Sequence, residues 1–64
     1  MKHKEWEKMF LDFLKNKERM MTVEEIAKGL LLNRIVVTKY MRRLAVKGEV
    51  RAQEINNEIC WGAT

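Results

Sequence analysis

The stretch Leu30–Leu44, LLLNRIVVTKYMRRL, combines two patterns that indicate different structures. Six of its first eight residues are aliphatic and three of those are β-branched, a composition typical of strands. Its second half instead places Lys39, Arg42 and Arg43 at helical spacing. Asn33 stands between the two patterns, and asparagine is a preferred residue at helix N-termini. We therefore expect one helix to end before Asn33 and another to begin after it.

The second of these helices is predicted over residues 34–47. Apolar residues recur in it at the i, i+3, i+4 and i+7 spacing of a buried helical stripe: Val37, Tyr40, Met41 and Leu44. Gly48 follows, and glycine commonly supplies the left-handed residue that ends a helix. Because the stripe uses only Val37 from the run Ile35-Val36-Val37, we expect Ile35 and Val36 to face outward.

Two further helices are predicted upstream. Residues 3–16 carry an apolar stripe at helical spacing: Trp6, Met9, Phe10, Phe13 and Leu14. We expect the charged residues, Glu7 among them, on the opposite and exposed side of this helix. The pattern Thr22-Val-Glu-Glu25 is a capping box, which predicts a helix from Val23 to Leu30. Residues 19–21, between the two helices, are a candidate for a short strand.

After Gly48 the apolar period changes from 3.6 to 2, as expected for strands. The alternating apolar residues are Val50, Ala52, Ile59, Trp61 and Ala63. Asn56 and Asn57 suit the tight turn of a hairpin, because asparagine tolerates positive φ. This turn places Ala52 opposite Trp61. We therefore expect Trp61 to cover the core and Cys60 to lie on the outer side of the hairpin.

Composition limits the kind of protein this is. The 64 residues suffice for one small domain, 1–64, and no apolar run exceeds three residues, so no membrane span is expected. The single cysteine, Cys60, and the single histidine, His3, are too few for a zinc site, and we expect a reducing, cytoplasmic location. No nucleophile and base are spaced for catalysis. We therefore expect neither an enzyme nor a cofactor, metal or small-molecule ligand.

The positive charge is concentrated in one segment. The formal net charge is +4, but residues 28–48 contain six basic side chains and no acidic one, and the rest of the chain carries −2. Such local charge attracts polyanions, of which nucleic acid is the commonest for a small intracellular domain. A helix face that is merely solvated is the alternative.

The order of these elements, with the segment EIAKGLLLNRIVVTKYMRRLAVKGEV (25–50), resembles a winged helix-turn-helix domain. Such a domain is mainly α, with three helices and a small β-hairpin, the wing. The chain is similar to minimal single-domain regulators, such as those of bacterial fimbrial operons or of archaea and plasmids. The resemblance implies sequence-specific binding of double-stranded DNA by a transcriptional regulator, with residues 34–47 in the major groove. Leu31 departs from the family, which commonly has glycine there, so we expect a reshaped turn.

The resemblance also implies which residues contact DNA. The first turns of the third helix would face base edges: Arg34, Ile35, Val36, Thr38 and Lys39. Phosphates would be bound by the helix start, by the later turns and by the hairpin: Asn33, Arg42, Arg43, Lys47 and Arg51.

One recognition helix reads only a few base pairs, so tight binding would need a homodimer. Candidates for the dimer surface are Leu11, Leu31, Ile35 and Val36. A protein-interaction module within a larger assembly is the alternative function, since the same fold also serves that purpose. Two features favour it: the hairpin tip Glu54–Glu58 is acidic at both ends, and Ile35-Val36 is aliphatic on the face that would read DNA.

Overall fold

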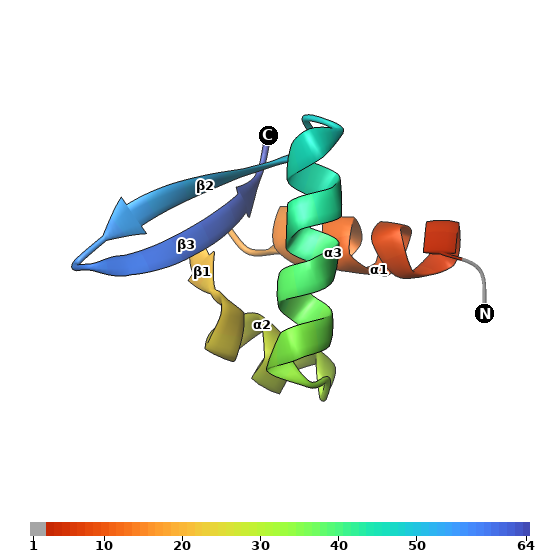
Figure 1. The fold of residues 1–64 in the computed structure, drawn as a ribbon, viewed down its shortest axis with the longest axis horizontal. Coiled ribbons are helices and arrows are strands. Elements are labelled where there is room, and N and C mark those ends of the chain that lie inside the picture. Colours follow the sequence, from red (N-terminus) through yellow and green to blue (C-terminus); the bar gives the residue numbers. More distant parts are fainter. Residues whose placement is uncertain (1–2) are drawn as a thin grey trace.

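The computed structural model describes residues 3–64, with side chains from Glu5 onward. Within that range the chain forms three helices and three strands (Figure 1): α1 (His3–Asn16), β1 (Met21–Thr22), α2 (Val23–Leu30), α3 (Arg34–Val46), β2 (Val50–Ile55) and β3 (Glu58–Ala63). The predicted ranges of the helices are confirmed to within one residue at each end. In Figure 1, α3 crosses α1, and the β2–β3 hairpin extends to one side of α3.

The strands form one antiparallel sheet in the order β1-β3-β2. Ala52 pairs with Trp61, as predicted. The turn residues Asn56 and Asn57 both have positive φ, 52° and 65°, which this two-residue hairpin turn requires. The expected arrangement of three helices and a hairpin is confirmed, and β1 extends it, because Met21 pairs with Trp61. The short strand expected at 19–21 lies at 21–22 instead.

Side chains cap the starts of α2 and α3. The Thr22 hydroxyl accepts a hydrogen bond from the Glu25 backbone N–H (3.2 Å), and the Glu25 carboxylate accepts one from the Thr22 N–H (3.0 Å). This is the predicted capping box. The Asn33 side-chain oxygen accepts from the Ile35 N–H at 2.7 Å. Both caps satisfy backbone donors that have no partner within their helix.

The turn between α2 and α3 keeps the conformation that glycine usually supplies. Leu31 has φ 57° and ψ 45°, in the left-handed region. The Leu32 N–H donates to the Ala27 carbonyl at 2.9 Å, which closes the end of α2. The expectation of a reshaped turn is therefore wrong: the leucine adopts the left-handed conformation, and the residue is 91% exposed.

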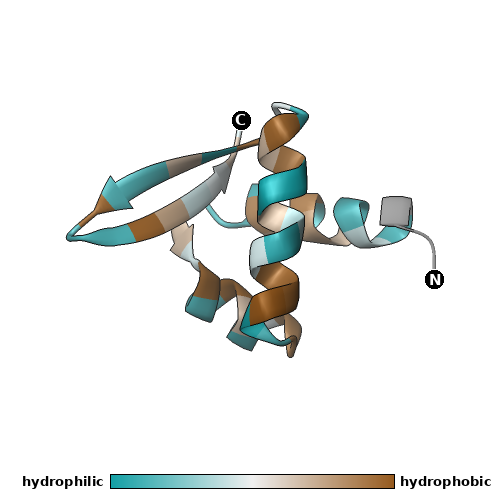
Figure 2. Cartoon of the chain, viewed as in Figure 1, coloured by the Kyte–Doolittle hydropathy of each residue, from teal (hydrophilic) through white to brown (hydrophobic). Residues whose placement is uncertain are grey.

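The core lies where the helices meet the sheet. Its fully buried large side chains come from all three helices: Phe10, Leu14, Ile26, Val37, Met41 and Leu44. Trp61 covers this core from β3 with 9% of its surface exposed, as predicted. The Tyr40 ring stacks with Phe10 (5.3 Å between centroids) and with Trp6 (5.7 Å). Along α3, short hydrophobic and hydrophilic groups of residues alternate (Figure 2), as expected for a helix of which only one side meets the core.

Two residues outside the predicted core are buried. Cys60 lies on the outer side of the hairpin, as expected, but it is buried there. The segment before β1 covers that side: the Met20 sulfur lies 2.5 Å from the point that a Cβ on Gly62 would occupy. Glu7 is also buried, with 6% of its surface exposed, so the expectation that it lies on the exposed side of α1 is wrong. It lies on the side of α1 that faces α3.

Candidate nucleic-acid interface

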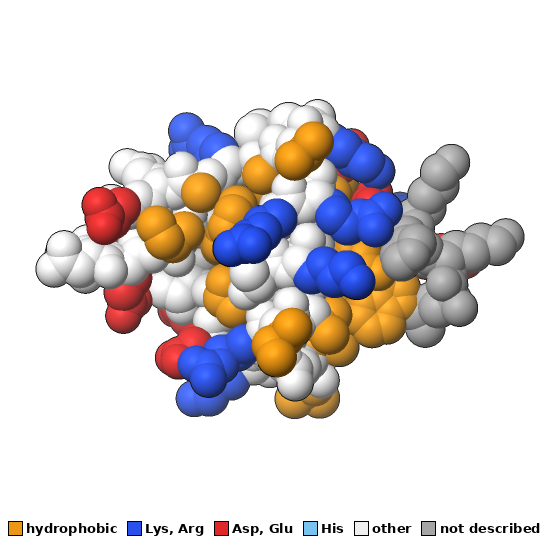
Figure 3. Space-filling model, in the orientation of Figure 1, with side chains coloured by type: hydrophobic (Ala, Val, Ile, Leu, Met, Phe, Trp, Pro, Cys, Tyr) orange, Lys and Arg blue, Asp and Glu red, His pale blue; other side chains and the backbone are white. Residues whose placement is uncertain are grey.

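The outward side of α3 is basic. The helix contains no acidic residue. Figure 3 shows lysine and arginine side chains over the middle of this side, with acidic side chains at the hairpin end and beside the basic side chains near the start of the helix. An open groove follows the helix and is lined by Arg34, Ile35, Thr38, Lys39 and Arg42. We call these five residues the groove edge of α3.

The cations of the groove edge are only weakly neutralised. The Arg34 guanidinium donates to the Glu24 carboxylate at 2.8 Å. Both side chains are mostly exposed, Arg34 at 67% and Glu24 at 73%. Exposed pairs of this kind contribute little, since water and salt screen them. Lys39 and Arg42 form no ion pair with any side chain that the structure describes. The groove edge therefore presents positive charge that an anion can approach.

An aliphatic side chain lies among these cations. Ile35 is 77% exposed, in the first turn of α3, and the half-buried Thr38 hydroxyl lies one turn further on. Neither residue is needed to fill the core. The groove edge thus offers a methyl surface, a hydroxyl and charged donors on one side of a single helix. Contacts of these three kinds, with thymine methyl groups, base edges and phosphates, are among those that side chains make in binding DNA.

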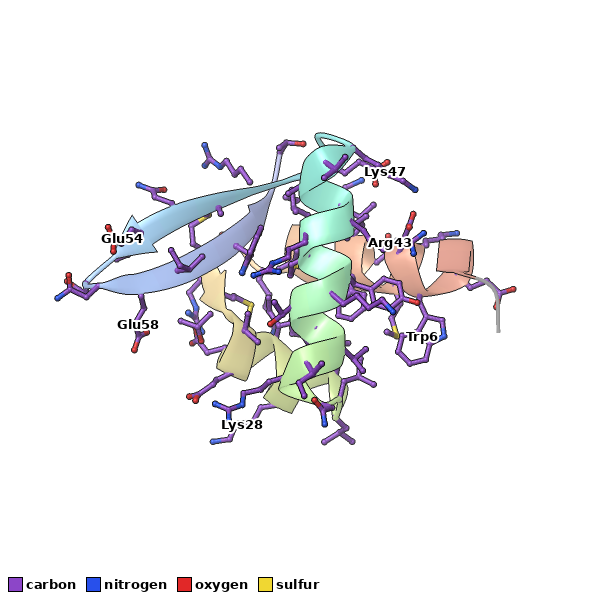
Figure 4. All side chains as sticks on the ribbon, viewed as in Figure 1. Trp6, Lys28, Arg43, Lys47, Glu54 and Glu58 are labelled. Atoms are coloured by element: carbon purple, nitrogen blue, oxygen red, sulfur yellow. The ribbon has the colours of Figure 1, made fainter. Side chains whose placement is uncertain are left out.

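The opposite edge of α3 is occupied by α1. Figure 4 shows Arg43 and Lys47 directed toward α1, on the side where Trp6 lies. The Lys47 ammonium donates to one Glu7 carboxylate oxygen at 2.6 Å, and the Arg43 Nε lies 3.4 Å from the other. The Arg43 guanidinium also lies 5.9 Å from the centre of the Tyr40 ring. We call Glu7, Arg43 and Lys47 the α1 edge of α3.

The electrostatics of the α1 edge keep Glu7 ionised. The hydrogen bond from Lys47, with the nearby charges of Lys47 and Arg43, lowers the pKa of the Glu7 carboxyl below its ordinary value. Burial alone would raise this pKa, but the two cations lower it by more. A buried carboxylate with two cationic partners is a compensated charge, and it would be costly to leave it alone.

The hairpin contributes little positive charge to the groove edge. Side chains alternate along β2, so Arg51 lies on the side of the sheet away from Val50 and the core. It lines a different cavity, with Lys15 and Arg19. Glu54 and Glu58 flank the exposed turn at the hairpin tip (Figure 4).

The structure brings together half of the ten residues expected at DNA. Those on one continuous surface are the groove edge residues, Arg34, Ile35, Thr38, Lys39 and Arg42. The others have different surroundings. Asn33 uses its side-chain oxygen to cap α3, Val36 is half-buried against the core, and Arg51 lies behind the sheet. Arg43 and Lys47 bind Glu7. Leu11, a candidate for the dimer surface, is also half-buried.

The sequence analysis missed Glu7. Its position indicates burial, because Glu7 lies three residues before Phe10 and seven before Leu14, on the same side of α1 as both. An acidic residue in an apolar stripe must be exposed at its margin or be paired. The segment 28–48 supplies the pairing cations.

Comparisons with protein families, with curated proteins and with solved structures found no match to this chain. Over residues 3–64, no helix is both long and apolar enough to cross a membrane. Nor does that part of the chain gather three or more His, Cys, Asp or Glu side chains into a possible metal site. The side chain of His3 lies outside the described residues.

Proposed function

We propose that this chain is a winged helix-turn-helix protein that binds double-stranded DNA, with the groove edge of α3 in the major groove. One observation carries the proposal: α3, which contains no acidic residue, exposes a continuous surface where Ile35 lies beside two cations, Lys39 and Arg42, that pair with no described carboxylate. The α2–turn–α3 unit and the adjacent hairpin are compatible with this layout. An α-helix has the width to enter the major groove of B-form DNA.

Each groove edge residue has a distinct role in the proposal. Ile35, at the start of α3, meets a thymine methyl group, and Thr38 bonds a base edge or a phosphate. Arg34 exchanges the exposed Glu24 carboxylate for a guanine edge or a phosphate. Lys39 and Arg42 bind phosphates, which supply affinity and salt dependence. Because one helix reads only a few base pairs, a small transcriptional regulator of this kind would act as a homodimer on repeated half-sites.

A titration of labelled random duplex DNA, followed by fluorescence anisotropy at about 50 and 200 mM salt, tests the proposal. We expect salt-dependent binding by the wild type. We expect Lys39→Glu with Arg42→Glu to weaken it by about tenfold or more, since two phosphate contacts become repulsive. Lys8→Glu with Lys15→Glu is the matched control. It changes the net charge equally, but on exposed positions of α1.

Two results would overturn the proposal. One is the absence of salt-dependent binding by the wild type at the lower salt concentration. The other is an equal loss of DNA affinity in the two double variants, because the affinity would then depend only on the net charge of the protein and not on the groove edge.

A protein-interaction module is the second candidate function. The observation that favours it is the exposure of two aliphatic side chains near the start of α3, Leu31 (91%) and Ile35 (77%). Exposed aliphatic side chains that lie together mark interaction surfaces more often than isolated ones do. Sedimentation of the wild type and of Ile35→Ser discriminates the two functions. Self-association that depends on Ile35, without DNA binding, would favour the interaction module.

A further inference from the structure

We infer that Glu7 acts as an internal competitor of DNA phosphates: it retains Arg43 and Lys47 on the α1 edge and confines phosphate contacts to the groove edge of α3. The inference rests on the proposed function and specifies which cations of α3 take part. It concerns a positioning residue, because Glu7 acts on DNA only through the two side chains that it holds.

The geometry favours retention. The Glu7 side chain is only 8% exposed, whereas Arg43 and Lys47 are 41% and 47% exposed. The carboxylate is therefore the desolvated member of the cluster and the cations are its only described charged partners. If both cations turned toward a phosphate, a buried charge would remain without compensation, which is strongly unfavourable.

A second ion pair, between the start of α3 and α2, provides the contrast. Arg34 and Glu24 are both mostly exposed, so that Glu24 remains solvated when Arg34 leaves it. Its exchange for a phosphate costs little. Glu7, with 8% of its side chain exposed, is far less accessible to water. The two pairs have similar distances, 2.8 Å for Arg34–Glu24 and 2.6 Å for Lys47–Glu7. They differ in the solvation of the carboxylate that remains when the pair separates, because Glu24 is exposed and Glu7 is buried.

Salt dependence measures the number of cations in contact with DNA. For duplex DNA, the slope of log affinity against log salt changes by about 0.9 for each phosphate that is neutralised. If Glu7 withholds Arg43 and Lys47 from DNA, replacing its carboxylate with a neutral amide makes two further phosphate contacts possible. We therefore expect Glu7→Gln to tighten binding to random duplex DNA and to steepen the slope by about 1 to 2.

Glu5→Gln is the matched control. It makes the same chemical change and adds the same charge, on the same helix, at an exposed position with no described ion pair. Its slope should equal that of the wild type. Equal slopes for Glu7→Gln and Glu5→Gln would overturn the inference.

The triple variant Glu7→Gln, Arg43→Gln, Lys47→Gln provides the second test. It leaves no uncompensated buried charge, and it should fold even if Glu7→Gln alone does not. We expect the wild-type slope, because it removes only cations that the wild type withholds from DNA. A shallower slope than that of the wild type would mean that Arg43 or Lys47 already contacts DNA, and would overturn the inference. Absence of salt-dependent binding by the wild type would instead overturn the proposed function, and the inference with it.

Discussion

The two edges of α3 carry similar side chains but have different surroundings. Arg42 and Arg43 are adjacent in the sequence, yet Arg42 lies on the open groove and Arg43 lies against a buried carboxylate. Lys39 and Lys47 differ in the same way. The helix itself does not make this distinction, because its own sequence is basic on both edges. The difference comes from α1, which contributes Glu7 to one edge only.

This comparison separates charge that is present from charge that is available. Six basic residues in one segment suggest a strong polyanion site, but three of them, Arg34, Arg43 and Lys47, already have carboxylate partners. Burial of the partner decides which of the three can exchange it for a phosphate. We therefore assign Arg34 to the proposed DNA surface, and Arg43 and Lys47 to the contacts that hold α1 against α3.

The largest expected effect concerns Trp61, which fixes the sheet beside α3. Without it, the hairpin would keep only smaller contacts with the core, such as that of Val50. We expect Trp61→Ala to lower the free energy of unfolding by about 3–5 kcal/mol, as is typical of large buried aromatic residues. DNA affinity should then fall only in proportion to the unfolded fraction. Urea unfolding, followed by circular dichroism, measures the change.

Trp61→Phe is the control for that variant. Among the described residues, the buried Trp61 indole N–H has no hydrogen-bond partner, so its removal loses no hydrogen bond. Phenylalanine should therefore retain most of the stability that alanine loses. If Trp61→Ala is as stable as the wild type but does not bind DNA, Trp61 would be a contact residue and the assignment of the DNA surface to α3 alone would fail.

An intermediate effect is expected at acidic pH, where the α1 edge loses its anion. The hydrogen bond from Lys47 lowers the pKa of Glu7, and the hydrogen bond from Arg19, at 2.9 Å, lowers the pKa of Glu25. As the pH falls below the ordinary value of 4.5, the unfolded chain takes up these protons before the folded chain does. The stabilisation by both groups is thus complete above that pH and is lost as the pH falls through the lowered pKa values.

Thermal unfolding between neutral pH and about pH 3 tests this prediction. Glu7→Gln should have a lower melting temperature than the wild type at neutral pH and should lose less on acidification. Glu5→Gln, which retains the cluster, should lose as much as the wild type. If the Glu7→Gln and wild-type curves remain parallel over the whole range, Glu7 does not stabilise the α1 edge through its charge.

The elements of the fold were predictable because their signals are local. The apolar period over α3, the cap at Asn33, the Thr22–Glu25 capping box and the turn at Asn56-Asn57 each involve residues close in sequence. The hairpin register followed from its turn for the same reason. Such signals fix where each helix and strand begins and ends.

The candidate site was only partly predictable, because its cations are sorted by contacts distant in sequence. Lys47 and Glu7 are separated by 40 residues, and no helical wheel of α3 alone shows that they meet. The burial of Cys60 has a similar origin, since it depends on the path of the segment before β1. Spacing within α3 identifies both edges as basic. Only the packing of α1 against α3 shows which edge is free.

The smallest expected effect concerns Leu31, which precedes α3 in a conformation that suits glycine. A φ of 57° is strained for a residue that has a Cβ, and Leu31, which is 91% exposed, contributes almost nothing to the core. We expect Leu31→Gly to be more stable than Leu31→Ala by about 1 kcal/mol, since alanine keeps the strain and glycine removes it. For a domain of this size, that corresponds to a rise in melting temperature of about 4–8 °C. Equal stabilities would mean that the turn relaxes to accept any residue. If Leu31→Gly is also at least as stable as the wild type, the leucine side chain does not stabilise the fold. Its exposure then favours a role at the partner surface, which the DNA affinities of the wild type and of the two variants would measure.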